Sequence, residues 1–180
     1  MKLYLVRHGE TDANKDGIMQ GVGLNYDLNR NGINNVKSLK KDIDKLDITA
    51  CFTSPLLRSW STAIILVGDR VEIKEDKRLI ERYLGDLEGK NKKDYNVKEY
   101  WDISLNSNEH GVEPIKNVIS RCEEFLDYLK ENYNESDNIL IVSHNAVVKA
   151  IINIIENKKY KTKLEVYNIP NGYFKELELK

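Results

Sequence analysis

The sequence has few cysteines, almost no net charge and no long apolar run, and each absence excludes a class of protein. Its two cysteines, Cys51 and Cys122, allow at most one disulfide and match no metal-binding spacing. The 28 basic residues nearly balance the 29 acidic ones, so no overall positive field would attract nucleic acid. The longest apolar stretch, 146–155, contains Lys149 and is too short to span a bilayer. The first apolar residues lead directly into an Arg-His pair, which is unlike a signal peptide.

These absences favour a cytoplasmic protein with neither nucleic-acid nor membrane partners. The 180 residues suffice for one domain with a sizeable core, and we expect a single domain over 1–180. Hydrophobic residues make up 41% of the chain and charged residues 32%, an ordinary globular balance, and no repeat, low-complexity segment or linker interrupts it. Cys122 lies on an apolar stripe of helical spacing, so we interpret it as a core residue.

Strand-like and helix-like patterns alternate along the chain. Short apolar runs predict strands at 3–6, 48–53, 71–74 and 139–142. Apolar residues at helical spacing predict helices at about 31–46, 56–67, 113–133 and 145–156, the third with Pro114 in its first turn. The tail, 165–179, is typical of two strands around the turn Pro170-Asn171-Gly172. The alternation favours an α/β protein, a three-layer sandwich with a mostly parallel central sheet.

Polar clusters follow three of the predicted strands. His8 follows the first strand, the segment ending in Arg58 follows the second, and Ser143-His144 follows the strand at 139–142. Because ligands bind at the carboxyl ends of parallel strands, we expect these clusters to converge at one edge of the sheet. The least regular intervals, 74–78 and 90–111, are expected to form loops over that edge.

The tetrapeptide Arg7-His8-Gly9-Glu10 is suited to attack on phosphorus. An imidazole is a good nucleophile at neutral pH, a guanidinium binds phosphate oxygens in pairs, and glycine lets the backbone approach closely. Arg58 supplies a second guanidinium, and His144 a further hydrogen bond or positive charge. Since these groups already neutralise a phosphate, the predicted phosphoryl transfer requires neither a metal nor another cofactor.

Four segments, in this order, carry a family resemblance: LVRHGET, SPLLRSWSTA, ERYLGDLEG and IVSHNAVVKA. Together they resemble the histidine phosphatase (phosphoglycerate mutase-like) superfamily over essentially the whole chain. The resemblance implies a phosphoglycerate mutase-like fold and a phosphohistidine on His8, with Arg7, Arg58 and His144 forming the phosphate pocket. It also implies that Glu81 donates a proton to the leaving group and later acts as base for water.

The resemblance extends to Asn14, as a further phosphate ligand, and to Gln20 and Gly21 at the substrate side of the pocket. Where the family often has Gly-Gly after the second histidine, this chain has Asn145-Ala146, and Asn145 can still donate its backbone N–H at a helix N-terminus. Ser59, Ser61 and the segment 25–28 also depart from the family pattern. These departures affect the shape of the substrate pocket and leave the reaction type unchanged.

Other polar residues have simpler interpretations. Glu10 is expected to pair with an arginine, Glu88 to brace its loop, and Thr11 to cap a helix. His110 lies in a loop rich in Asn and Ser and is expected to be solvated. The lysines at 90, 92 and 93 form a charged run that could contact an anionic substrate or simply be solvated.

The sequence therefore predicts a metal-independent phosphatase for a small phosphorylated metabolite. A phosphoglycerate mutase uses the same pocket, but the short interval between Glu81 and Glu113 limits how well water can be excluded, which favours hydrolysis. A silent phospho-ligand binding module is a third reading, disfavoured because a binder has no need of an acid. The physiological substrate and the choice between monomer and homodimer stay open.

Overall fold

Five strands form the centre of the protein, for which a computed structural model describes residues 1–156, 163–164 and 167–180. The strands are β1 (Lys2–Arg7), β2 (Ala50–Thr53), β3 (Ile73–Glu75), β4 (Asn138–Ser143) and β5 (Phe174–Glu178), in the order β3-β2-β4-β1-β5. The pairs β3·β2, β2·β4 and β4·β1 are parallel, and β5 alone runs antiparallel, against β1. The prediction of a mostly parallel sheet is confirmed.

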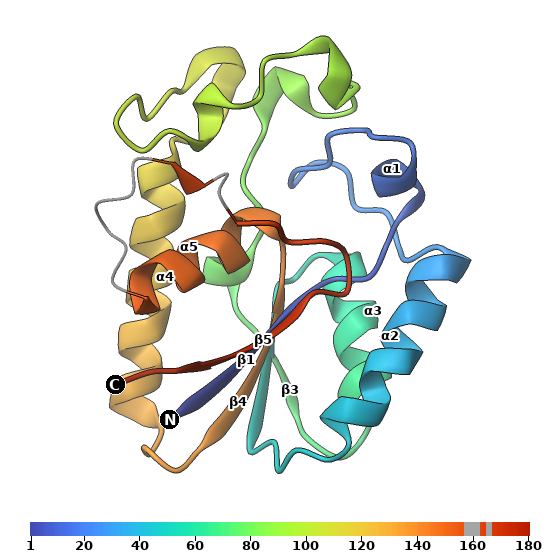
Figure 1. Ribbon diagram of the computed structural model, residues 1–180, viewed down its shortest axis with the longest axis vertical. Helices are drawn as coiled ribbons and strands as arrows, with labels where there is room; N and C mark the ends of the chain where they lie inside the picture. Colours follow the sequence, from blue (N-terminus) through green and yellow to red (C-terminus); the bar gives the residue numbers. More distant parts are fainter. Residues whose placement is uncertain (157–162, 165–166) are drawn as a thin grey trace.

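Alternate side chains of the strands enter two separate cores, as the two-residue period of a strand requires. On β1, Leu3 and Leu5 enter one core, and Tyr4 and Val6 enter the other. Helices α4 (Ile115–Asn132) and α5 (Asn145–Ile155) cover the first face, and α2 (Arg30–Ile43) and α3 (Leu57–Val67) cover the second (Figure 1). The result is the predicted three-layer sandwich.

Residues 84–112, which we call the covering segment, lie over the carboxyl ends of the strands (green to yellow in Figure 1). The segment is built from short 3₁₀ turns at Gly85–Leu87, Lys92–Asp94, Glu99–Trp101 and Glu109–Gly111. Its own apolar cluster holds it together, with Leu87, Tyr100 and Val112 buried. The short helix α1 (Asp12–Lys15), which the sequence did not predict, lies near it (Figure 1).

Several predicted boundaries are displaced, and local contacts explain the shifts. Helix α2 begins one residue early because the Asn29 side chain accepts the Gly32 N–H at 2.8 Å. Helix α4 begins at Ile115, so Pro114 is the residue before the helix rather than part of its first turn. The third strand is Ile73–Glu75 rather than 71–74, because β2, which it pairs with, begins only at Ala50.

The tail forms one strand where two were expected. Of the expected first strand, 165–166 lie outside the described residues, and Tyr167 to Ile169 are not in a strand. Ile169 is instead buried in the core, and its carbonyl accepts a hydrogen bond from the Arg7 side chain at 2.6 Å. A peptide group used in this way is not available for a ladder of strand hydrogen bonds.

Both cysteines are free and buried, on opposite faces of the sheet. Burial raises the pKa of each thiol to about 12, so both stay protonated and unreactive at neutral pH. No helix in the described part of the chain is long and apolar enough to cross a membrane.

Candidate active site

The three polar clusters meet because β4 lies between β1 and β2. His8 follows β1, Ser54 follows β2, and His144 follows β4, so neighbouring strands deliver them to one edge. The rings of His8 and His144 lie with their centroids 5.1 Å apart. The His144 Nε2 atom lies 2.7 Å from the Ser54 hydroxyl oxygen. Residues from distant parts of the chain therefore share one site, as the sheet argument predicts.

The main chain around His8 is fixed from two neighbouring elements. The His8 N–H donates to the Ser143 carbonyl at 2.9 Å, and the Gly9 N–H donates to the Thr62 hydroxyl at 3.0 Å. Thr62 in turn donates to the Arg58 carbonyl at 2.7 Å, which ties α3 to the same loop. The imidazole thus projects from a backbone in which the N–H groups of His8 and Gly9 are both hydrogen-bonded.

The ring of His8 is neutral and has a defined tautomer. Its Nδ1 lies 2.7 Å from the Gly9 carbonyl oxygen, which only accepts, so Nδ1 carries the hydrogen and Nε2 keeps its lone pair. Burial lowers the pKa of His8 well below 6.5, and the charges of Arg7 and Arg58 lower it further. At neutral pH the Nε2 lone pair is therefore available for attack.

His144 differs from His8 in its partners. Its Nε2 is shared by the hydroxyls of Ser54, at 2.7 Å, and Ser59, at 3.2 Å. Its Nδ1 is buried and has no hydrogen-bond partner among the described residues. Burial, with the charge of Arg58 next in size, lowers the pKa of His144 well below 6.5. A bound phosphate dianion would reverse this effect, because an adjacent negative charge favours the protonated ring.

The two arginines are held by backbone carbonyls. Arg58 is fully buried and donates to the carbonyls of Gly21, at 2.9 Å, and Leu24, at 3.0 Å. Arg7 donates to the Ile169 carbonyl, and neither arginine is in an ion pair within the described part of the chain. Burial lowers the pKa of Arg58 to about 10, so it remains charged at neutral pH. A buried cation and a partly buried one, both held without a carboxylate, make a strong anion site.

Glu81 is also held by the backbone. Its Oε1 accepts the Arg82 N–H at 2.8 Å and the Ala146 N–H at 3.3 Å, and the residue is 8% exposed. Ala146 lies in the first turn of α5, directly after Asn145. The carboxylate therefore lies at the N-terminus of α5, and Glu81 lines the cavity described next.

A cavity of about 320 Å³ opens beside these residues. Its lining includes five of the predicted site residues: Arg7, Asn14, Gln20, Glu81 and Asn145. His8, Arg58, His144 and Gly21 do not line it. His8 and His144 are each adjacent in sequence to a lining residue, and the Gly21 carbonyl faces Arg58. The far side of the cavity is formed by the covering segment, with Leu84, Leu87, Val97, Tyr100 and Trp101.

The Glu88 carboxylate holds the loop that contains Gly21 through two backbone hydrogen bonds. The Glu88 carboxylate accepts the Val22 N–H at 2.9 Å and the Gly23 N–H at 2.7 Å. A Cβ atom on Gly21 would lie only 2.2 Å from the Glu88 Oε1, so no larger residue fits there without movement. Glu88 was expected to brace its own loop, where its Oε1 accepts the Leu84 N–H at 3.5 Å. Its main contacts are with the neighbouring loop, and through them Glu88 also fixes the two carbonyls that hold Arg58.

The remaining candidates divide into confirmed and wrong predictions. Thr11 caps α1, as predicted, and also donates to the Gln20 side chain at 2.8 Å. His110 is exposed, as predicted. The predicted Glu10–arginine pair is wrong, because Glu10 accepts from the side chains of Asn29 at 2.9 Å and Asn31 at 3.1 Å. The two amides lie at the start of α2, and their hydrogen bonds hold the Glu10 carboxylate there rather than against a guanidinium group.

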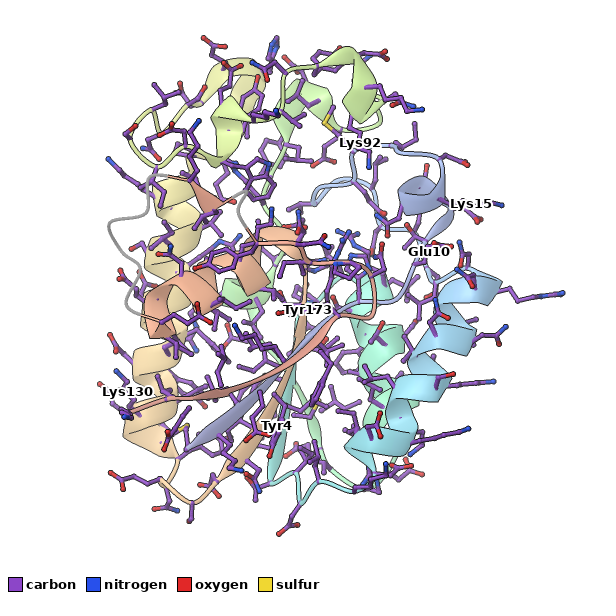
Figure 2. The ribbon with its side chains drawn as sticks, viewed as in Figure 1. Tyr4, Glu10, Lys15, Lys92, Lys130 and Tyr173 are labelled. Carbon is purple, nitrogen blue, oxygen red and sulfur yellow. The ribbon has the colours of Figure 1, made fainter. Side chains whose placement is uncertain are left out.

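Lys92 is the one member of the charged run 90–93 that lines the cavity, and it lies in the part of the covering segment next to α1 (Figure 2). Among the lining residues with a charged or amide side chain, two were not assigned a role from the sequence, Arg82 and Asn171. Arg82 is buried and donates through Nε to the Glu113 carbonyl at 2.6 Å. Asn171 belongs to a turn that the sequence did mark, and only its contacts reveal a place in the site.

Comparisons with known proteins agree with this geometry. A model of the histidine phosphatase superfamily (branch 1) matches residues 3–180. A Schizosaccharomyces pombe protein named as a probable phosphatase is 30% identical over 92% of this chain and 80% of its own length. The adenosylcobalamin/alpha-ribazole phosphatase of Escherichia coli is 29% identical over 84% of this chain and 77% of its own length. The structure of Bacillus stearothermophilus YhfR superimposes with a TM-score of 0.87 at 27% identity, covering 99% of this chain and 91% of that one.

Proposed function

The chain belongs to the histidine phosphatase superfamily, and from that premise we propose that it hydrolyses small phosphomonoesters through a phosphohistidine on His8. Its relatives are phosphatases, which supports phosphatase activity. The observation that carries the mechanism is the state of His8: a buried, neutral ring with its hydrogen on Nδ1. Beside that ring, Arg7 and Arg58 hold positive charge with no carboxylate bound to them.

In the first step the substrate's phosphoryl group binds Arg7, Arg58 and the Nδ1 of His144. The His8 Nε2 lone pair then forms a bond to phosphorus while the ester P–O bond breaks in line. The arginines stabilise the charge on the non-bridging oxygens, and Glu81 in its protonated form gives its proton to the leaving alkoxide. The products of this step are a free alcohol, phosphohistidine and ionised Glu81.

In the second step Glu81 acts as the base. It removes a proton from a water molecule as the water oxygen attacks phosphorus and the P–Nε2 bond breaks. Inorganic phosphate leaves, His8 is again neutral, and Glu81 again carries its proton. Every proton and electron pair is supplied by the substrate, the water and these residues, so the proposed cycle needs no metal or cofactor.

The cavity supports a substrate of metabolite size. About 320 Å³ is enough for a phosphate and a modest alcohol, and its wall combines apolar side chains with Asn14, Gln20 and Lys92. We propose that Asn14 contacts the phosphate, and that Gln20 and the Asn145 backbone contact the leaving group. Gly21 contributes through its carbonyl, which holds Arg58 at 2.9 Å.

A phosphoglycerate mutase is the second candidate, because it would use the same pocket and return the phosphoryl group to a hydroxyl. The cavity has room for a substrate hydroxyl in place of the water molecule, which allows a mutase. The two relatives described above are named as phosphatases, which favours hydrolysis. A silent binding module is the weakest candidate, since it gives no role to the fixed Glu81 carboxylate.

One experiment separates these candidates. The protein is incubated with a panel of phosphomonoesters, including 3-phosphoglycerate, in the presence of a chelator, and both phosphate release and isomerisation are measured. We expect phosphate release without added metal and its loss in His8→Ala. Isomerisation of 3-phosphoglycerate without phosphate release would overturn the hydrolase proposal, and full activity of His8→Ala would overturn the mechanism.

A further inference from the structure

The turn at 170–172 lies against the loop of the nucleophile, although more than half of the chain separates them in sequence. The Gly172 N–H lies 3.1 Å from both the Arg7 and the His8 carbonyl oxygens. In return, the Tyr173 carbonyl accepts the Arg7 N–H at 3.0 Å. The backbone of residues 7–8 is therefore fastened to this turn from both sides.

The side-chain amide of Asn171 faces three oxygen atoms. Its Nδ2 lies 3.2 Å from the His8 carbonyl oxygen, 3.3 Å from the Gly9 carbonyl oxygen and 2.9 Å from the Asn14 Oδ1. Because a carbonyl oxygen only accepts, the NH₂ end of Asn171 must point toward them. The Gly9 carbonyl is also the acceptor for His8 Nδ1–H, so Asn171 contacts the atom that sets the tautomer of His8.

The same contact fixes which end of Asn14 enters the cavity. The Asn14 Oδ1 accepts from Asn171 and, at 3.3 Å, from the Thr11 backbone N–H, and a backbone N–H can only donate. Both donors therefore hold the oxygen of this amide, which leaves its NH₂ for the cavity that Asn14 lines. A phosphate oxygen needs a donor there, and a reversed amide would present a repelling oxygen.

We propose that Asn171 is a positioning residue for phosphoryl transfer. It orients the Asn14 amide as a donor toward the phosphate and holds the Gly9 carbonyl that keeps the hydrogen of His8 on Nδ1. This inference rests on the proposed function of His8, and it adds a residue from the far end of the chain to that site.

The sharpest test is Asn171→Asp, which keeps the shape and replaces the donor with a carboxylate. The carboxylate faces three acceptors, and Asn14 can satisfy it only by turning its NH₂ away from the cavity. We expect kcat/KM for p-nitrophenyl phosphate to fall about 100-fold, the range for loss of a fixed donor at a developing negative charge. We also expect the acid limb of the pH profile of kcat/KM to move upward, because a nearby negative charge favours protonated His8.

Two further variants separate positioning from folding. Asn168→Asp places the same charge three residues away on an exposed side chain, and it should leave kcat/KM unchanged. Inhibition by orthovanadate is measured for Asn171→Asp with and without Asn14→Ala. Its affinity should fall about tenfold in the natural background and about twofold when Asn14 is already lost, because residues acting through one contact are not additive.

The outcomes are distinct. Loss of activity in both His8→Ala and Asn171→Asp, with an upward-shifted acid limb and coupling to Asn14, supports the inference. Activity of Asn171→Asp within twofold of the natural protein, while His8→Ala is inactive, overturns it and leaves the proposed function standing. An equal vanadate effect in both Asn14 backgrounds also overturns it. Full activity of His8→Ala would instead refute the proposed function.

Discussion

Glu81 is positioned by one of its two carboxylate oxygens. Its Oε1 accepts the Arg82 N–H at 2.8 Å and the Ala146 N–H at 3.3 Å. Such anchoring fixes the direction of the carboxyl group and suits the proposed role of Glu81 as acid toward the leaving group and base toward water. Ala146, which follows His144 and Asn145, therefore matters for the site because its N–H donates a hydrogen bond to the Glu81 carboxylate.

We predict that Glu81→Gln slows the hydrolysis of alkyl phosphates far more than that of p-nitrophenyl phosphate. An alkoxide needs a proton as it leaves, and the loss should be about 10²- to 10⁴-fold in kcat, whereas nitrophenolate leaves unaided. Steady-state kinetics on the two substrates checks this. Glu10→Gln is the matched control and should affect both substrates equally. Equal slowing of both substrates by Glu81→Gln would assign Glu81 a positioning role instead.

Lys92 allows a prediction about substrate choice. Its side chain is exposed at the cavity, so its charge acts through water and is screened by salt. For phosphomonoesters that carry a second anionic group, Lys92→Ala should raise KM by roughly fivefold at low salt, with kcat unchanged, as expected for an exposed ion pair. Lys90→Ala, in the same run but outside the cavity lining, is the control. An unchanged KM for every phosphomonoester that carries a second anionic group would show that Lys92 is only solvated.

At the scale of elements, α2 crosses the loop that follows β1 at a point where both segments have a glycine, Gly32 and Gly9. A Cβ atom on Gly32 would lie 2.2 Å from the Glu10 carbonyl oxygen and 2.6 Å from its nitrogen. A Cβ atom on Gly9 would lie 2.8 Å from the Val36 side chain. The backbone of the loop thus rests directly on the helix, and the position of His8 depends on this contact.

Gly32→Ala should therefore lower the free energy of unfolding by about 1–3 kcal/mol, the usual cost of overpacking a tight contact. Urea unfolding followed by circular dichroism measures it. Asn35→Ala, at an exposed position of α2, is the control and should be neutral or slightly stabilising because alanine favours helix. A Gly32→Ala protein as stable as the control would mean that the helix can shift away from the loop at little cost.

The sequence was sufficient for the long helices, for the parallel strands and for the meeting of His8, Arg58 and His144 at one edge of the sheet. Periodicity located the strands and long helices because it reports burial, and the parallel sheet then placed His8, Arg58 and His144 at one edge. The periodicity could not reveal α1, which has only four residues. Nor could it reveal that the Ile169 carbonyl serves Arg7 or that Asn171 meets Asn14, because these contacts join residues more than 150 positions apart.

For the whole molecule, the two buried histidines of the site predict how the free energy of unfolding depends on pH. His8 and His144 have a pKa near 6.5 when unfolded and well below it when folded. Below pH 6.5 the unfolded chain binds protons that the folded protein does not, so the free energy of unfolding falls as the pH decreases. The slope from the two rings approaches about 1.4 kcal/mol per pH unit for each. Inorganic phosphate should reduce this slope, because a bound dianion favours protonated His144.

Urea titrations on both sides of pH 6.5 test this dependence. The double variant His8→Gln/His144→Gln should flatten the slope, and His110→Gln, at an exposed ring, should not. An unchanged slope in the double variant would place the titrating groups elsewhere.

We also propose that the chain unfolds as one domain, and its two tryptophans allow a test. Trp60 lies in α3 and Trp101 lies in the covering segment. Variants with a single tryptophan, Trp60→Phe and Trp101→Phe, report on the two regions separately. The fluorescence transitions in urea should coincide with each other and with circular dichroism. An earlier transition at Trp101 would make the covering segment an independent unit.

The pairing of β1 has a consequence for the order of events during synthesis. Strand β1, which ends directly before His8, is made before the other strands of the sheet, yet its two neighbours, β4 and β5, begin only at Asn138 and Phe174. A nascent chain therefore exposes an unpaired apolar strand while most of the protein is still being translated, a situation that slows folding and invites association with chaperones. The His8 carbonyl gains its hydrogen bonds from Asn171 and Gly172 only when the turn at 170–172 has emerged.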